Sequence, residues 1–183
     1  MELGNQQERR EADLHWLAGF IDGEGCFSIL CSRARRYPHL SVQARIVMSA
    51  KLAYAETERI LKAEGLAYHI AVHGASKIGS KPTWHFTVSG MKRLRSFCPV
   101  IKPFLRVKQH ECHELMQFIE SRFSRGRRAP YSDFEVDCYI RLRDLHGYRL
   151  RESSETTRES LLQTRYSPFS DRKTESAAEM TAP

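Results

Sequence analysis

The sequence has no apolar run of about 18 residues, the length a membrane-spanning helix needs, and the segment 1–13 is polar and charged. Neither a transmembrane helix nor a secretory signal is therefore expected. The five cysteines form no Cys-x-x-Cys pair, and their odd number argues against a disulfide framework or a zinc site. We expect an intracellular protein in a reducing compartment, neither secreted nor bound to a membrane.

No segment of the 183 residues is repeated, and the length suits one domain. The composition changes near Arg149 to Arg, Ser, Glu and Thr with few large apolar residues, which predicts a folded domain over 1–148 and a polar, disordered tail over 149–183. The formal net charge is +7; five Lys/Arg against six Asp/Glu from Arg151 onward leave +8 on residues 1–150. This excess favours a polyanionic partner such as nucleic acid.

The segment 14–24 has features that an ordinary helix lacks. Apolar residues recur at helical spacing, but Gly19 and Gly23 stand four residues apart and each costs about 1 kcal/mol of helix propensity. Their bare backbones would share one face, where a second helix can approach closely. Asp22 and Glu24 add negative charge at the helix end that is already negative, which is unfavourable unless a cation binds there.

The nine residues Leu17-Ala18-Gly19-Phe20-Ile21-Asp22-Gly23-Glu24-Gly25 resemble the signature of the LAGLIDADG homing endonucleases. They depart from it at Phe20, Gly23 and Glu24. The alternative that the residues alone leave open is a core helix with two incidental glycines.

This resemblance implies roles for the acids of the motif. The last acid, Glu24, would be the catalytic metal ligand, the carbonyl of Gly23 would contribute, and the ion would be Mg²⁺ or Mn²⁺. Asp22 would hold helix ends in register rather than bind metal. Without the resemblance, Glu24 is an exposed acid at the end of a helix.

The segment Ile101–Gln109 resembles the family's lysine-glutamine pair at the start of a helix, which implies a catalytic role for Lys108. A plain phosphate contact or a solvated lysine is the alternative. The small homodimeric members also carry a glutamine and a basic residue after the second strand. Here Met48-Ser49-Ala50-Lys51-Leu52 supplies only Lys51, which puts the peripheral catalytic residues in doubt.

One acid per chain is too few to cut two strands, and the motif occurs once. We therefore expect a homodimer with an isologous interface, which places two copies of Glu24 at the dyad. The predicted interface residues are Leu17, Gly19, Phe20, Asp22 and Gly23.

Apolar periodicity predicts an α+β fold in the order αββαββα, with four strands in one antiparallel sheet covered by helices on one face. The family resemblance implies the same order, with the saddle-shaped sheet of the homing-endonuclease fold. Residues 1–10 are expected to be a mobile lead-in. Helices are expected over 11–23, 50–64, 91–97, 107–123 and 132–146, and strands over 26–32, 39–48, 68–73 and 84–89.

The uncovered face of that sheet would carry Ser, Gln, His, Arg and Thr, which can hydrogen-bond base edges in the major groove. An ordinary solvated sheet face is the alternative. The predicted DNA contacts on the strands are Ser28, Ser32, His39, Ser41, Gln43, Arg45, His69, His73, His85 and Thr87. The loop residues Arg33, Arg35, Arg36 and Lys77 are predicted phosphate contacts.

These observations predict a site-specific, metal-dependent endonuclease that cuts double-stranded DNA as a homodimer on a long pseudo-palindromic target. The alternative is a non-cleaving nucleic-acid binder on the same scaffold, either a maturase that binds intron RNA or a DNA-binding regulator. An interaction protein with an incidental basic surface fits the polar strand faces poorly.

Overall fold

The computed structural model describes residues 2–32, 39–74, 81–126, 128–147 and 154–162. Within these ranges no helix is both long enough and apolar enough to cross a membrane. The elements in chain order are α1 (Glu2–Glu24), β1 (Gly25–Ser32), β2 (His39–Met48), α2 (Lys51–Ala63), β3 (His69–His73), β4 (Thr83–Ser89), α3 (Met91–Ile101), the 3-10 helix η1 (Lys102–Phe104), α4 (Gln109–Arg125), α5 (Asp133–Leu145) and α6 (Ser154–Leu162).

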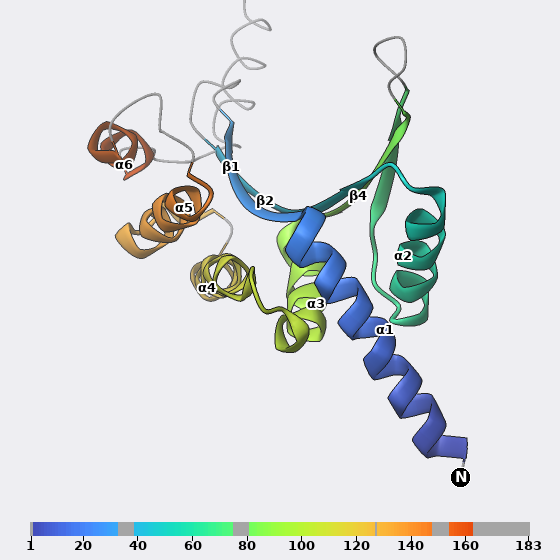
Figure 1. Ribbon diagram of the computed structural model, residues 1–183. Coiled ribbons are helices and arrows are strands. Elements are labelled where there is room, and N and C mark those ends of the chain that lie inside the picture. The colour runs from blue at the N-terminus through green and yellow to red at the C-terminus, as the bar shows by residue number, and fades with distance from the viewer. Residues whose placement is uncertain (1, 33–38, 75–80, 127, 148–153, 163–183) are drawn as a thin grey trace, which may run out of the picture.

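The strands form one antiparallel sheet in the order β1-β2-β4-β3. Cys26 pairs with Arg45, Arg45 with Thr87, and Thr87 with His69, so these residues make a row across all four strands. The sheet curves over the helices like a saddle (Figure 1). The predicted α+β fold, with its αββαββα order and four-stranded antiparallel sheet, is confirmed.

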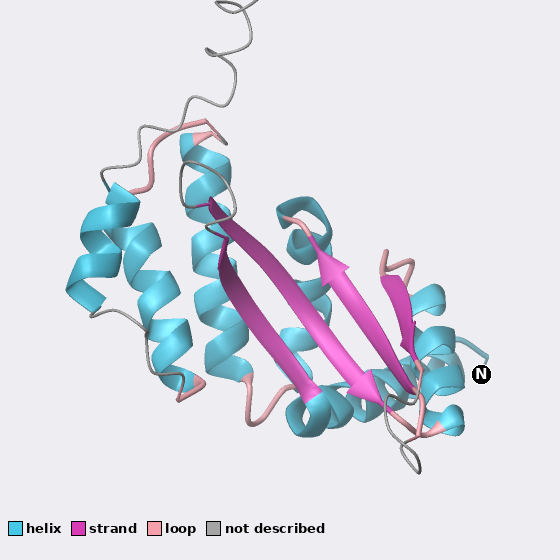
Figure 2. Ribbon diagram, turned by 90° about the horizontal axis from the view of Figure 1, so that it is seen from above, coloured by secondary structure: helices cyan, strands magenta, loops and turns pink. Residues whose placement is uncertain are grey.

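The two faces of the sheet differ because apolar and polar residues alternate along the strands. Phe27, Ala44, Phe86 and Val88 point inward and are buried against the helices, together with Leu17 of α1. Seen from above, no helix crosses in front of the strands (Figure 2). The sheet therefore has one core face and one open face.

Helix α1 begins at Glu2, so the expectation of a mobile lead-in over 1–10 is wrong for the described part of that segment. Two ion pairs with α2 and the residue after it hold the first half of the helix. The Arg10 guanidinium donates twice to the Glu64 carboxylate, each at 2.8 Å, and Arg59 donates to Asp13. Figure 1 shows this part of α1 extending past the body of the molecule.

Helix α3 continues through Pro99 to Ile101, four residues beyond the predicted end. Pro99 is exposed and lies in the last turn, where it removes only the hydrogen bond to the carbonyl of Arg95. Cys98 and Ile101 are fully buried. Burial of this apolar stripe outweighs the lost hydrogen bond.

Helix α5 begins with the predicted capping box. The Ser132 hydroxyl accepts from the Glu135 backbone N–H at 3.3 Å, and the Glu135 carboxylate accepts from the Ser132 N–H at 3.0 Å. Glu135 is fully buried and also pairs with Arg122 at 3.2 Å and Arg125 at 3.0 Å. This carboxylate ties α5 to α4.

Helix α6 lies in the segment 149–183, where the composition predicts a polar, disordered tail apart from a short helix around Leu161 and Leu162. Leu161 and Thr157 are buried, and Arg158 donates to Asp137 of α5 at 2.8 Å. The boundary at residue 148 stays a prediction, because 148–153 and 163–183 lie outside the described residues.

Candidate DNA-cleavage site

The chain passes from α1 directly into β1 at Gly25. A Cβ atom on Gly25 would lie 2.6 Å from the carbonyl oxygen of Ile21 and 2.8 Å from its side chain. Any other residue would push the strand away from the helix end. Gly25 therefore fixes the position of Glu24, the last residue of the helix, at the edge of the sheet.

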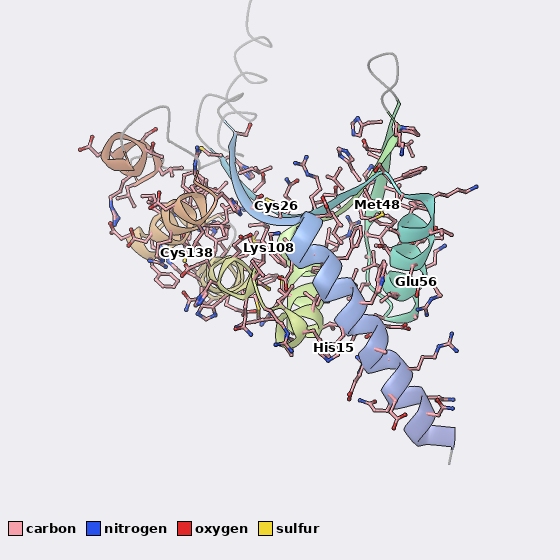
Figure 3. The ribbon with its side chains drawn as sticks, viewed as in Figure 1. His15, Cys26, Met48, Glu56, Lys108 and Cys138 are labelled. Atoms are coloured by element: carbon pink, nitrogen blue, oxygen red, sulfur yellow. The ribbon has the colours of Figure 1, made fainter. Side chains whose placement is uncertain are left out.

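Lys108 and Asp22 tie the end of α1 to the start of α4. The Lys108 ammonium donates to the carbonyls of Asp22 at 2.6 Å and Ile21 at 3.1 Å. In return, the Asp22 carboxylate accepts from the backbone N–H groups of Arg106 at 2.8 Å and Lys108 at 2.9 Å. Each helix end thus receives the opposite charge. Figure 3 shows Lys108 beside the C-terminal part of α1.

This arrangement gives Asp22 the positioning role that the resemblance implied, within its own chain. Burial raises the pKa of Asp22. Hydrogen bonds from the backbone N–H groups of Arg106, Lys108 and Val107 lower it by more, so that the pKa lies below its usual value. The carboxylate is held ionised. It stabilises the junction only in that form.

Asp22→Asn is expected to lower the free energy of unfolding by about 1 kcal/mol at pH 7, because the amide keeps one acceptor where two are used. A lowered folded pKa means that the stabilisation is complete above the unfolded pKa and is lost as the pH falls through the folded pKa. Urea unfolding at pH 7 and near pH 3 measures this difference, which should shrink in acid. An equal difference at both pH values would contradict the role. The exposed Asp144→Asn is the control.

Glu24 is exposed, and within the described part of the chain its carboxylate makes no hydrogen bond or ion pair. No described side chain donates to the Gly23 carbonyl either, because Lys108 is engaged with Ile21 and Asp22. A carboxylate and a carbonyl are oxygen ligands of the kind that Mg²⁺ prefers. Over the described ranges no three metal-ligating side chains lie together. One chain thus fits a divalent ion as an incomplete site.

The outer face of α1 is bare. A Cβ atom on Gly19 or Gly23 would meet nothing within 4 Å, so packing within the chain requires neither glycine. Trp16 stacks on Phe20 beside them, with ring centroids 5.4 Å apart and planes 12° apart, and is 39% exposed. Two bare glycines and a half-exposed aromatic pair make a surface suited to another helix.

Two residues of the predicted interface do not lie on this face. Leu17 is 0% exposed in the core of its own chain, which corrects its assignment to the interface. The carboxylate of Asp22 is directed to the start of α4. Trp16 was missed by the sequence reasoning; its position three residues before Gly19 was the available signal.

All the predicted DNA contacts on strands lie on the open face of the sheet and are exposed or half-buried. Leu30 also lies there, 44% exposed and paired with Ser41, and belongs with them because an apolar side chain can contact the methyl group of thymine. The predicted phosphate contacts Arg33, Arg35, Arg36 and Lys77 lie outside the described residues.

Two further groups lie near the site. In the segment Met48–Leu52, which lacks the family's glutamine, Met48 is buried in the core and Lys51 is exposed at the start of α2. At the start of β1, the Cys26 thiol lies 3.8 Å from His146 Nε2, which is 3.0 Å from a carboxylate oxygen of Glu111. Sequence reasoning missed this contact because it joins residues 120 positions apart.

The fold is similar to those of several solved structures. The structure is similar to the homing endonuclease I-CvuI in complex with the I-CreI target and Mg, with a TM-score of 0.64, 19% identity and coverage of 84% of this chain and 94% of that one. A second I-CvuI structure contains its target and Ca. The archaeal intron-encoded homing endonuclease I-Vdi141I, complexed with DNA, gives 0.63 at 17% identity, with 82% and 95% covered.

The LAGLIDADG meganuclease I-AabMI, bound to uncleaved DNA, gives a TM-score of 0.57 at 18% identity, but only 50% of that chain is covered against 82% of this one. No curated protein sequence matches. The family model described as LAGLIDADG endonuclease matches residues 17–110, 94 of the 183 residues, and so spans the motif, the sheet and Lys108. The chain belongs to the LAGLIDADG endonuclease family.

Proposed function

We propose that this protein is a site-specific, metal-dependent endonuclease that cuts both strands of duplex DNA as a homodimer. The observation that carries the proposal is Glu24, an exposed carboxylate without a partner among the described residues, at the junction of the motif helix and the open sheet. An acid at a helix C-terminus is unfavourable by itself and becomes favourable when it holds a cation.

Hydrolysis of a phosphodiester requires charge neutralisation on the phosphate and an activated water. A divalent ion held by Glu24 and the Gly23 carbonyl would supply both. Glu24 has no competing partner in the described ranges, so it is free to bind. Lys108 uses two of its three N–H donors on α1 and retains one for a phosphate oxygen or water. Lys108 thereby positions the helix end that carries Glu24.

Assembly through the outer face of α1 accounts for the glycines. Each glycine weakens the helix by about 1 kcal/mol, and no close contact to a described residue offsets this loss. Close approach of a second α1 at Gly19 and Gly23 would bury the Trp16–Phe20 stack and bring two Glu24 carboxylates together. The chain spans nearly all of I-CvuI but half of I-AabMI, a ratio that fits one half of a two-part enzyme.

The open sheet face is the proposed DNA surface. Its four strands contain no Asp or Glu, and Arg45 and Gln43 stand near its centre on β2. Arg45 is suited to pair with guanine and Gln43 with adenine in the major groove. An acid-free face accepts phosphate on either side without repulsion.

A non-cleaving binder on the same scaffold, either a maturase that binds intron RNA or a DNA-binding regulator, is the second candidate. The lack of a glutamine in the segment Met48–Leu52, where the family resemblance implies one, favours it. Assaying duplex cleavage in Mg²⁺ by the wild type and by Glu24→Gln distinguishes the two. A nuclease cuts only with Glu24 intact, whereas a binder binds without cutting in both forms.

We further propose a reducing intracellular compartment. All five cysteines are free thiols, and Cys98, Cys112 and Cys138 are buried in the core. Burial raises the pKa of the Cys138 thiol to about 12, which keeps it protonated and unreactive.

A further inference from the structure

Two histidines are in ring contact on the open face of the sheet. His73 ends β3 and His85 lies on β4, with ring centroids 4.2 Å apart and planes at 41°. The register pairs His73 with Thr83 and His85 with Ala71, so the rings meet diagonally across the two strands. The Thr83 hydroxyl lies 3.3 Å from His85 Nε2. We call these two residues the histidine pair.

The charged and titratable groups around the histidine pair are few. β2 contributes Arg45, β3 contributes His69, and Lys81 precedes β4; no strand contributes an acid. Residues 75–80, which join β3 to β4, lie outside the described residues. Among the described residues, the strands around the pair therefore contribute only neutral or positive groups.

These surroundings oppose protonation. Burial lowers the pKa of His85, and the charges of His73 and Arg45 lower it further. Two imidazoles whose ring centroids lie 4.2 Å apart cannot both be charged without strong repulsion. The free protein thus disfavours the charged form of His85, whose ring keeps unused capacity to bind a proton.

We propose that the histidine pair is a proton-linked DNA contact, which takes up one proton from solvent when duplex DNA binds and carries it as a cation facing the phosphates. This inference rests on the proposed DNA-binding function of the sheet. The negative potential of the duplex replaces the positive surroundings of the free face and reverses the sign of the field at the rings. The protonated imidazole offers donors at both nitrogens.

The direction of the pH effect follows from linkage. DNA raises the pKa of the pair, so affinity is highest below the pKa of the free pair and falls as the pH rises through the pKa of the bound pair. One proton per pair corresponds to a loss of about ten-fold in affinity per pH unit between those two pKa values for each pair that faces the duplex, and so to about 100-fold for the two pairs of the proposed dimer. The pair thus makes DNA binding by this face stronger in mildly acidic conditions.

The first experiment uses the free protein. NMR titration of the histidine ring protons should show His85 titrating below the usual pKa, and His73→Gln should raise it, because a neighbouring charge is removed. His69→Gln removes a histidine from the same face without touching the pair and should leave the titration of His85 unchanged. An unperturbed His85, or one insensitive to His73→Gln, would overturn the coupling.

The second experiment measures the Kd for a random-sequence duplex by fluorescence anisotropy from pH 6 to pH 8. Over the steepest pH unit the wild type should lose about ten-fold more affinity per bound chain than the double variant His73→Gln/His85→Gln, which is about 100-fold for a bound dimer. Equal slopes would refute the inference and leave DNA binding intact. Failure of the wild type to bind DNA at any pH would instead contradict the proposed function. Circular dichroism establishes that the variants fold.

Discussion

Cleavage of duplex DNA in Mg²⁺ is expected to fall by about 10³-fold or more when Glu24 is replaced by glutamine. The amide is nearly the same size but is a weak ligand for a hard cation, so the ion that neutralises the phosphate is lost. A 10³-fold loss corresponds to about 4 kcal/mol of transition-state stabilisation. Glu24 makes no hydrogen bond or ion pair with the other described residues, so folding should be unaffected.

DNA binding separates this loss from a general defect. Glu24→Gln removes a negative charge from a DNA-facing position, so its affinity for duplex should equal or exceed that of the wild type. Glu11→Gln is the matched control: Glu11 is exposed on the same helix and accepts only from Gln7, at 2.8 Å. It should cut at the wild-type rate. If the Glu24→Gln variant cut DNA at the wild-type rate, the assignment of Glu24 as a metal ligand would be wrong.

Gly19→Leu is expected to convert the proposed dimer to a monomer and to abolish the proposed double-strand cleavage. A Leu side chain on the bare face would hold two copies of α1 several ångströms apart, whereas the chain itself has open space there. Sedimentation velocity should show the monomer mass, and cleavage should fall at least as far as in Glu24→Gln. If the Gly19→Leu variant were dimeric and active, the dimer interface would not include Gly19.

Gly19→Ala is expected to stabilise the folded chain and to weaken the proposed dimer, so the two effects can be told apart. Alanine should raise the free energy of unfolding of the isolated chain by about 1 kcal/mol through helix propensity, because nothing within 4 Å opposes its Cβ atom. The same Cβ atom should weaken the dimer. Gly74→Ala, also in open space but outside any helix, is the control. Destabilised folding without loss of the dimer would show that Gly19 serves its own chain.

The fold was predictable from sequence wherever the pattern was local. Strand β2, His39–Met48, alternates so regularly that both ends were predicted correctly, and Ser132 with Glu135 fixed the start of α5. The ends that were mispredicted depend on distant contacts. Helix α1 begins at Glu2, and its Arg10 pairs with Glu64, 54 positions away, a contact that no local pattern reveals.

Part of the candidate site was also predictable, because part of it lies in a local sequence pattern. The nine-residue motif identifies Glu24 and the two glycines without any structure. Spacing alone could not show that Leu17 turns inward while Trp16 turns outward, since the core-facing side of a helix is set by what packs on it. The contact between Asp22 and Lys108 joins residues 86 positions apart, and no local pattern reveals it.

The central claim is that each chain contributes one acid, which cuts one DNA strand. The most direct measurement follows the cleavage of a supercoiled plasmid, carrying the selected target, by a mixed dimer of one wild-type chain and one Glu24→Gln chain. The two chains carry different affinity tags, so that the mixed dimer can be purified. The mixed dimer should nick one strand and accumulate open circles, while the wild-type dimer gives linear DNA. Linear product from the mixed dimer, or no cutting at all, would contradict the claim.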